Sequence, residues 1–156
     1  MKKILVLALA IVMALSVVAL VACGTEETVE GSYEYANAWT EGQQYGCKVK
    51  VTVKGGVITA IEVTEDTETY YNLSAGWTDK SKWEQGAEAM INSFIGRTVE
   101  EINAISVPCN ATGESPVGQP KTIDGAPAEL KIVTGATQSS GRLILAVQNA
   151  LSKLGK

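Results

Sequence analysis

The sequence contains no histidine, and this absence removes several classes of chemistry at once. Zinc sites commonly rely on imidazole ligands, and the serine or cysteine nucleophiles of many hydrolases depend on a histidine base. The acidic residues over 62–68 also lack the Asp-x-Asp-x-Asp-Gly spacing of a calcium-binding loop. We therefore expect no metal site and no histidine-dependent hydrolase, and we interpret these carboxylates as the solvated end of a strand.

Basic residues are in the minority, with 13 Lys and Arg against 17 Asp and Glu. If residues 1–22 are removed, Lys2 and Lys3 leave with them, and the remaining 11 basic residues face all 17 acidic ones, a net charge of −6. Nucleic acids bind proteins largely through positive charge. We therefore expect no nucleic-acid partner and no electrostatic adhesion to anionic lipid.

The N-terminus has the build of a secretory signal peptide. Two lysines precede an apolar run over residues 4–22, with small residues before Cys23. A single transmembrane anchor is the alternative, because the run approaches the ~20 residues that span a bilayer. The tetrapeptide LVAC at 20–23 resembles a bacterial lipobox, which implies cleavage of the signal peptide (1–22) and lipidation of Cys23.

The chain after the signal peptide is long enough for one domain with a buried core and too short for two. The acidic, polar residues 23–30 are interpreted as a short lipidated tether, and residues 31–156 as the domain. This arrangement predicts a protein on the extracytoplasmic face of a bacterial cell membrane, held there by its lipid.

Cys47 and Cys109 are the two cysteines that remain, in a compartment where disulfides persist. If paired, they would close a loop of roughly sixty residues, for which the chain-entropy model gives roughly 4 kcal/mol. Two buried free thiols are the alternative, because spacing alone does not determine connectivity. Two cysteines without histidine also make a poor metal site.

Residue patterns predict a small single-domain α+β fold, an antiparallel hairpin meander packed with two or three helices. Alternating β-branched residues on both sides of Gly55-Gly56 predict a hairpin over 46–66, and a first strand is expected over 31–39. Apolar spacings of three and four predict a helix over 81–96. A capping-box pattern predicts a short helix from Thr98.

The C-terminal third contains a long loop, a strand-to-helix turn and a final helix. All four prolines fall within 107–129, a loop long enough to be functional or mobile. The run 129–133 predicts a short strand, and apolar spacing predicts a helix from Arg142 onward. The turn between them, 134–140, would offer bare amides and a positive dipole end to a phosphate. An ordinary N-cap by Thr137 or Ser139 is the alternative.

The turn TGATQSS at 134–140 resembles the Ser/Thr-Gly-Ala-Thr-x-Ser/Thr-Ser signature of the FMN-binding domain family. That family includes extracytoplasmic flavin subunits of sodium-pumping and ferredoxin-linked respiratory complexes, and free-standing surface lipoproteins. The resemblance extends to GSYEY at 31–35, Tyr45-Gly46, the hairpin over 51–63 and the pair Glu68-Thr69. In the family, a flavin transferase joins FMN through its phosphate to the last threonine of the tetrapeptide, which here is Thr137.

The resemblance implies a cofactor site built from the signature and three residues outside it. These residues are Thr134, Gly135, Ala136, Thr137, Gln138, Ser139, Ser140, Lys131, Glu68 and Thr69. Lys131 stands where the family usually has aspartate, so the sequence leaves open whether FMN is covalent or is held by Lys131 through its phosphate. Nearby aromatic residues would either line the flavin ring or fill the core: Tyr70, Tyr71, Trp77 and Trp83.

Together these features predict a lipid-anchored FMN protein that carries electrons rather than an independent enzyme, because no residue need act as an acid or base. Its implied partners are the membrane, a flavin transferase, and a redox partner protein or quinone-linked chain. The alternative is a surface binding lipoprotein of the same fold that has lost the flavin, which the lysine at 131 favours. A hydrolase built on Ser139 or Ser140 is disfavoured, because no base is placed beside either hydroxyl.

Overall fold

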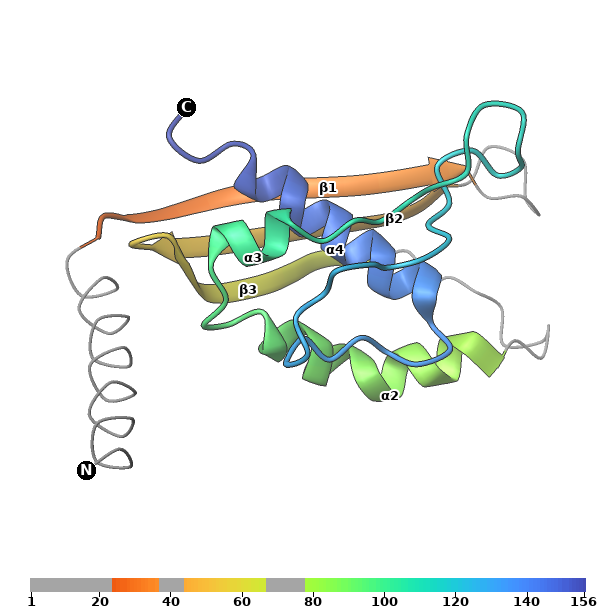
Figure 1. Cartoon of the computed structure of the whole chain (residues 1–156), viewed down its shortest axis with the longest axis horizontal. Helices are drawn as coiled ribbons and strands as arrows, with labels where there is room; N and C mark the ends of the chain where they lie inside the picture. The colour runs from red at the N-terminus through yellow and green to blue at the C-terminus, as the bar shows by residue number, and fades with distance from the viewer. Residues whose placement is uncertain (1–23, 37–43, 67–77) are drawn as a thin grey trace, which may run out of the picture.

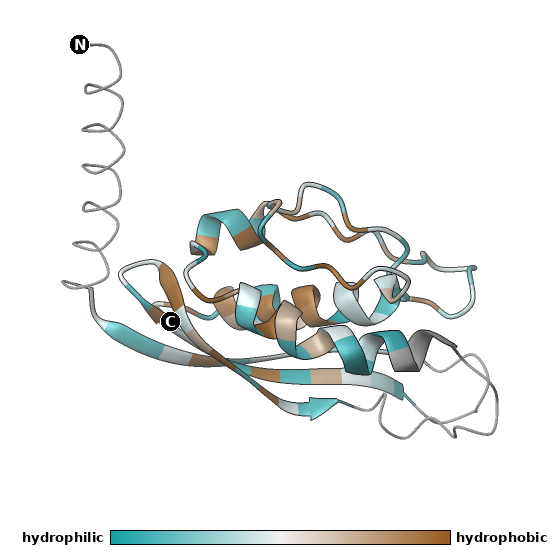
Figure 2. Ribbon diagram, turned by 90° about the horizontal axis from the view of Figure 1, so that it is seen from below, coloured by the Kyte–Doolittle hydropathy of each residue, from teal (hydrophilic) through white to brown (hydrophobic). Residues whose placement is uncertain are grey.

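The structure is a computed structural model that describes residues 24–36, 44–66 and 78–156. In these residues three antiparallel strands form one sheet in the order β1-β2-β3, and helices lie against one of its faces (Figures 1 and 2). The elements are β1 (Glu26–Ala36), β2 (Gln44–Lys54), β3 (Val57–Asp66), α2 (Thr78–Ser93), α3 (Val99–Asn103) and α4 (Thr137–Leu151). The structure confirms the predicted single-domain α+β fold. None of the helices in these ranges has the length and apolar character of a membrane span.

The β2–β3 hairpin forms where the alternation predicted it. Gly55 and Gly56 both have positive φ, 58° and 78°, as a two-residue hairpin turn requires and as glycine permits without strain. Val49, Val51 and Val53 point into the core. Lys48 and Lys50, which alternate with these valines, face solvent beside carboxylates of the neighbouring strands, with Lys48 Nζ 2.8 Å from Glu65 and Lys50 Nζ 3.7 Å from Glu30.

Strand β1 begins earlier in the chain than the sequence analysis expected. Residues 26–30, interpreted there as part of a tether, pair in register with β2, from Glu26 opposite Lys54 to Glu30 opposite Lys50. Alternation explains this, because Val29 is buried while Glu26 and Glu30 face solvent. Glu26 and Glu30 therefore belong to the solvent-exposed face of a strand instead of a flexible linker.

Helix α4 crosses the inner face of the sheet and supplies much of the core (Figure 1). Its buried apolar residues are Leu143, Ile144, Ala146, Val147, Ala150 and Leu151. Gly31 of β1 lets the helix approach closely, since a Cβ there would overlap the Ala146 carbonyl oxygen and the Ala150 backbone nitrogen. The contact holds α4 closely against β1.

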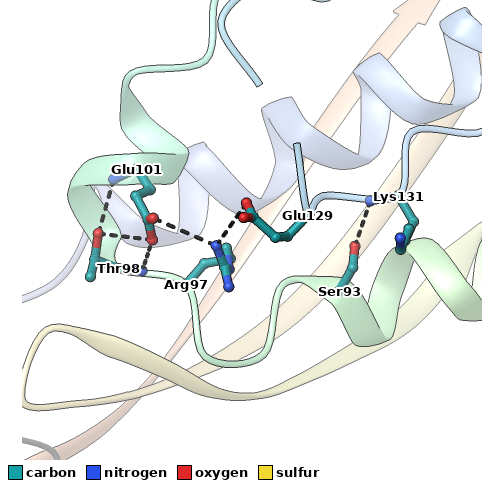
Figure 3. A network of polar contacts seen from close by, with 6 residues as sticks. All are labelled: Ser93, Arg97, Thr98, Glu101, Glu129 and Lys131. Atoms are coloured by element: carbon teal, nitrogen blue, oxygen red, sulfur yellow. Dashed lines mark hydrogen bonds and ion pairs between the residues drawn. The ribbon is translucent and has the colours of Figure 1, made fainter. Parts of the chain in front are cut away.

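The connection between α2 and α3 covers the start of the outer edge of β3. The Ile58 N–H donates to the Arg97 carbonyl (2.9 Å), and the Gly96 N–H donates back to the Ile58 carbonyl (2.8 Å). The predicted capping box then starts α3: Thr98 Oγ1 accepts the Glu101 N–H at 3.1 Å, and the Glu101 carboxylate accepts the Thr98 N–H at 2.8 Å (Figure 3). Helices α2 and α3 are thereby attached to the sheet.

The prediction of a strand over 129–133 is wrong. The backbone of this segment bonds to hydroxyls of two helices: the Lys131 N–H donates to Ser93 Oγ of α2 at 3.0 Å (Figure 3) and the Val133 N–H donates to Ser140 Oγ of α4 at 3.3 Å. The edge of β3 beside Ile58 is already taken by the α2–α3 connection. The segment therefore runs between the helices as irregular chain.

The proline-rich segment 107–129 folds back on itself. Cys109 and Pro120 form an isolated antiparallel bridge, as do Ser106 and Asp124. The Asn110 N–H donates to the Gln119 carbonyl at 2.9 Å within the same excursion. The loop is therefore an irregular hairpin with internal hydrogen bonds.

Candidate functional site

The signature lies at a tight turn that leads directly into α4. The Ala136 N–H donates to the Val133 carbonyl at 3.0 Å, closing a four-residue turn whose third residue, Gly135, has φ 77°. A positive φ at this position is the requirement of a type II turn and favours glycine. The first bond of the helix follows at once, from the Ser140 N–H to the Ala136 carbonyl at 3.0 Å. Helix α4 thus begins at Thr137, earlier than Arg142.

The N-cap of α4 is an alanine, and no side chain caps the helix from that position. The structure therefore contradicts an ordinary N-cap by Thr137 or Ser139. Helix geometry leaves the amides of the first turn without intrahelical acceptors, and no acidic residue stands in that turn. The exposed positive end of the dipole is suited to an anion from outside the helix.

The seven signature residues divide into an exposed and a buried set. Thr134, Gly135 and Gln138 are exposed and Thr137 is half-buried. Ser139 and Ser140 are buried, and the Ser140 hydroxyl accepts the Val133 N–H, so it holds the turn in shape. A ligand at the surface would therefore meet the exposed set and the Thr137 hydroxyl first.

Helix α2 lies along the segment that precedes the signature. A Cβ on Gly86 would lie 2.8 Å from the Val133 side chain, so glycine allows the helix to pack directly on this segment. One turn earlier on the same face, Lys82 Nζ lies 2.7 Å from the position that a Cβ on Gly135 would occupy. The Lys82 ammonium therefore lies at the turn itself. No local pattern in the sequence marks Lys82, because only the packing of α2 brings it to this turn.

Lys131 is anchored at the other end of α2. Its backbone N–H donates to Ser93 Oγ, beside the ion pairs that Arg97 makes with Glu101 (3.6 Å) and Glu129 (3.4 Å) (Figure 3). Ser93 is about 16 Å of helical rise from Lys82. The lysine that the structure brings to Gly135 is thus Lys82.

A buried polar cluster joins three elements close to the signature. Asp66, the last residue of β3, accepts the Trp83 indole N–H at 2.9 Å and an Arg142 N–H at 2.9 Å. Trp83 is 5% exposed and Arg142 1%. Trp83 therefore belongs to the core, and Asp66 is a partner of buried groups instead of the solvated carboxylate that the sequence analysis expected. The cluster ties α2 and α4 to the end of β3.

Cys47 and Cys109 are not joined to each other in the structure, so the possible disulfide is not formed. Cys47 is buried in β2, and Cys109 donates to the Val107 carbonyl at 3.3 Å. The Tyr33 hydroxyl lies 3.4 Å from Cys109 Sγ and donates to the Gly118 carbonyl at 2.7 Å. Burial, aided by the contact with Cys109, raises the pKa of Tyr33. In the part of the chain described, no cluster of Cys, Asp and Glu could hold a metal ion.

Other residues singled out from the sequence lie outside the described ranges. They are Glu68, Thr69, Tyr70, Tyr71 and Trp77, which follow β3, and Cys23, which precedes β1. The site that can be described is therefore the turn, the first turn of α4, and the parts of α2 and β3 that support them.

Comparison with known proteins identifies one family. Residues 44–152, from the start of β2 to the residue after α4, match the family model described as FMN-binding domain. The matched region includes the signature turn together with Lys82 and Asp66. No curated protein matches the chain, and no solved structure does.

Proposed function

The chain belongs to the FMN-binding domain family, and FMN is its cofactor. From this premise we propose that the protein is a membrane-anchored, extracytoplasmic electron carrier with FMN attached through its phosphate to Thr137. The observation that carries the attachment is the position of Thr137. It is the first residue of a helix with an alanine N-cap, beside an exposed turn.

The residues at the turn fit a phosphate. The donor set consists of backbone amides at a helix start, the Thr137 hydroxyl and the Lys82 ammonium, all of which bind phosphate in proteins. Gly135 lets the Lys82 side chain lie directly against this turn, because a Cβ there would overlap it. No carboxylate of the first turn competes with an incoming anion.

Attachment at Thr137 requires an activated donor, a phosphoric anhydride of FMN such as FAD. The Thr137 oxygen forms a bond to phosphorus while the anhydride P–O bond breaks. The hydroxyl loses its proton, and the departing nucleoside monophosphate keeps the bonding electron pair. Because the first turn of α4 has no carboxylate that could take this proton, the base is proposed to come from a flavin transferase, which is therefore an expected partner.

The attached FMN supplies reversible electron acceptance, and the protein supplies position. Ser140 holds the turn, Lys82 adds positive charge, and the Asp66 cluster ties the supporting elements together. Because none of these roles is acid–base chemistry, we propose an electron carrier rather than an independent enzyme, with a redox partner protein or a quinone-linked chain as its partner. A covalent bond also suits a compartment in which a lost cofactor could not be replaced.

The lipid anchor is proposed at Cys23. Because β1 begins at Glu26, three residues later, a lipid on this cysteine would lie within about 10 Å of the sheet. Gly24 packs against the β2–β3 turn, since a Cβ on Gly24 would overlap the backbone of Gly55. The proposed anchor therefore emerges next to this hairpin turn.

The attachment is tested by co-expressing the protein with a flavin transferase, then separating it under denaturing conditions and measuring in-gel fluorescence and intact mass. Wild type should carry one FMN, and Thr137→Ala none. Thr28→Ala is the control, because it removes an exposed threonine hydroxyl from β1, outside the signature, and it should remain labelled. A labelled Thr137→Ala variant would refute attachment at this residue. An unlabelled wild-type chain would refute covalent attachment, and if it also bound no FMN it would favour the flavin-free binding lipoprotein.

A further inference from the structure

We propose that Lys82 holds the phosphate of FMN at the start of α4 and so positions it for attachment to Thr137. This inference rests on the proposed function and adds a residue outside the signature to the site. The lysine comes from α2, far from the signature in sequence, and reaches it because α2 packs along the segment that ends in Gly135.

The position of the Lys82 ammonium supports this role. Lys82 Nζ lies 2.7 Å from where a Cβ on Gly135 would stand, and Gly135 is the exposed centre of the turn before Thr137. Gly86, on the same helix face, sits directly on Val133. Helix packing therefore sets the position of the Lys82 backbone, and the ammonium lies beside Gly135, which is two residues before Thr137 in the chain.

The charges around the start of α4 also favour an anion beside Lys82. The start of α4 is the positive end of a helix dipole, and the structure adds a lysine ammonium beside it. No carboxylate in the described part of the chain forms an ion pair with Lys82. Two positive features placed together in an acidic protein repel each other until an anion lies between them. A departure of this kind from local electrostatic preference is expected at a functional site.

Lys131 provides a matched comparison. It is also exposed and lies three residues before the signature, but its backbone is bonded to Ser93 at the opposite end of α2. Replacement of either lysine by glutamine changes the net charge of the protein by the same amount. A difference between the two variants therefore reports position and not net charge.

The experiment measures two properties of Lys82→Gln, Lys82→Met, Lys82→Arg and Lys131→Gln. The first is the initial rate at which a purified transferase moves FMN from FAD to the apoprotein. The second is the increase in the urea midpoint of unfolding when the flavin is attached. Loss of an exposed cation should slow transfer by roughly threefold to fivefold in both neutral Lys82 variants. Their midpoint increase should also be smaller, while Lys131→Gln matches wild type and Lys82→Arg retains most of both effects.

Three outcomes would overturn the inference. Neutral Lys82 variants that match wild type in both measurements would show that the ammonium does not meet the phosphate. A lower apoprotein midpoint with an unchanged increase on attachment would assign Lys82 a structural role. Slower transfer with an unchanged increase would place Lys82 in the contact with the transferase. All three require a wild-type chain labelled at Thr137, so they are distinct from failure of the proposed function.

Discussion

At the scale of single residues, the buried pair of Asp66 and Arg142 is the most consequential contact near the site. Arg142 is 1% exposed, and its guanidinium lies 2.9 Å from the Asp66 carboxylate. Removing that carboxylate would leave a buried positive charge without this ion pair. Removing one partner of a buried pair costs about 3–5 kcal/mol. Asp66 is partly exposed, so we expect Asp66→Ala to lower the free energy of unfolding by roughly 2–3 kcal/mol.

Urea unfolding followed by Trp fluorescence measures this loss. Glu65→Ala is the matched control, because it removes the neighbouring carboxylate from an exposed ion pair with Lys48, a change worth under about 1 kcal/mol. Equal losses in the two variants would contradict the assignment of Asp66 to the core cluster.

Because Tyr33 is partly buried, we expect the free energy of unfolding to fall at alkaline pH. Burial raises the pKa of its phenol above the ordinary value of about 10. The unfolded chain therefore ionises Tyr33 first, so stability is fully present below pH 10 and falls as the pH rises beyond it, with a limiting slope of about 1.4 kcal/mol per pH unit. The free energy of unfolding of wild type minus that of Tyr33→Phe should be constant from pH 7 to 9 and decline above 10. A flat difference up to pH 11 would refute this.

At the scale of elements, the approach of α4 to β1 depends on Gly31. A Cβ at this position would meet backbone atoms of α4, which cannot move aside singly. Overpacking of this kind typically costs 1–3 kcal/mol, and we expect Gly31→Ala to cost about 3 kcal/mol. Gly46→Ala is the control, because the atoms nearest to a Cβ there belong to the flexible Glu34 side chain. Chemical denaturation of both variants measures the difference, and similar losses would contradict the packing described.

Elements defined by local pattern were predictable, and those defined by long-range contacts were not. The hairpin at Gly55-Gly56 and the capping box at Thr98 each depend on residues close together in the sequence, and the structure confirms both. The segment 129–133 has the apolar character of a strand, but its amides bond to Ser93 and Ser140, which no local pattern indicates. Short apolar runs are ambiguous for this reason.

The candidate site shows the same division. The signature and its place before a helix could be read from the sequence, because turn residues and helix periodicity lie within about twenty residues of each other. Lys82 and Asp66 could not, since α2 and β3 supply them through packing across the domain. Lys131 is close to the signature in the sequence, but its backbone N–H donates to Ser93 Oγ at the far end of α2 from Lys82.

At the scale of the whole molecule, the proposed anchor and the flavin site lie at opposite ends of the domain. Strand β3 begins at the hairpin turn next to Gly24. It ends at Asp66, which lies beside Arg142 near the start of α4 (Figure 1). Ten residues of strand separate these ends by about 30 Å. The net negative charge also opposes lying flat on anionic lipid. The site should therefore project away from the membrane.

This geometry favours a redox partner with a domain outside the bilayer over direct exchange with a quinone inside it. In vesicles of anionic lipid carrying the lipidated, flavinylated protein, water-soluble iodide should quench the flavin fluorescence, while nitroxide-labelled lipids should leave it unchanged. A control with nine Gly/Ser residues inserted after Gly24 releases the domain from the proposed anchor and should retain iodide quenching. Strong quenching of wild type by the labelled lipids would show that the flavin reaches the membrane. Electrons would then have a direct route to a lipid-soluble carrier.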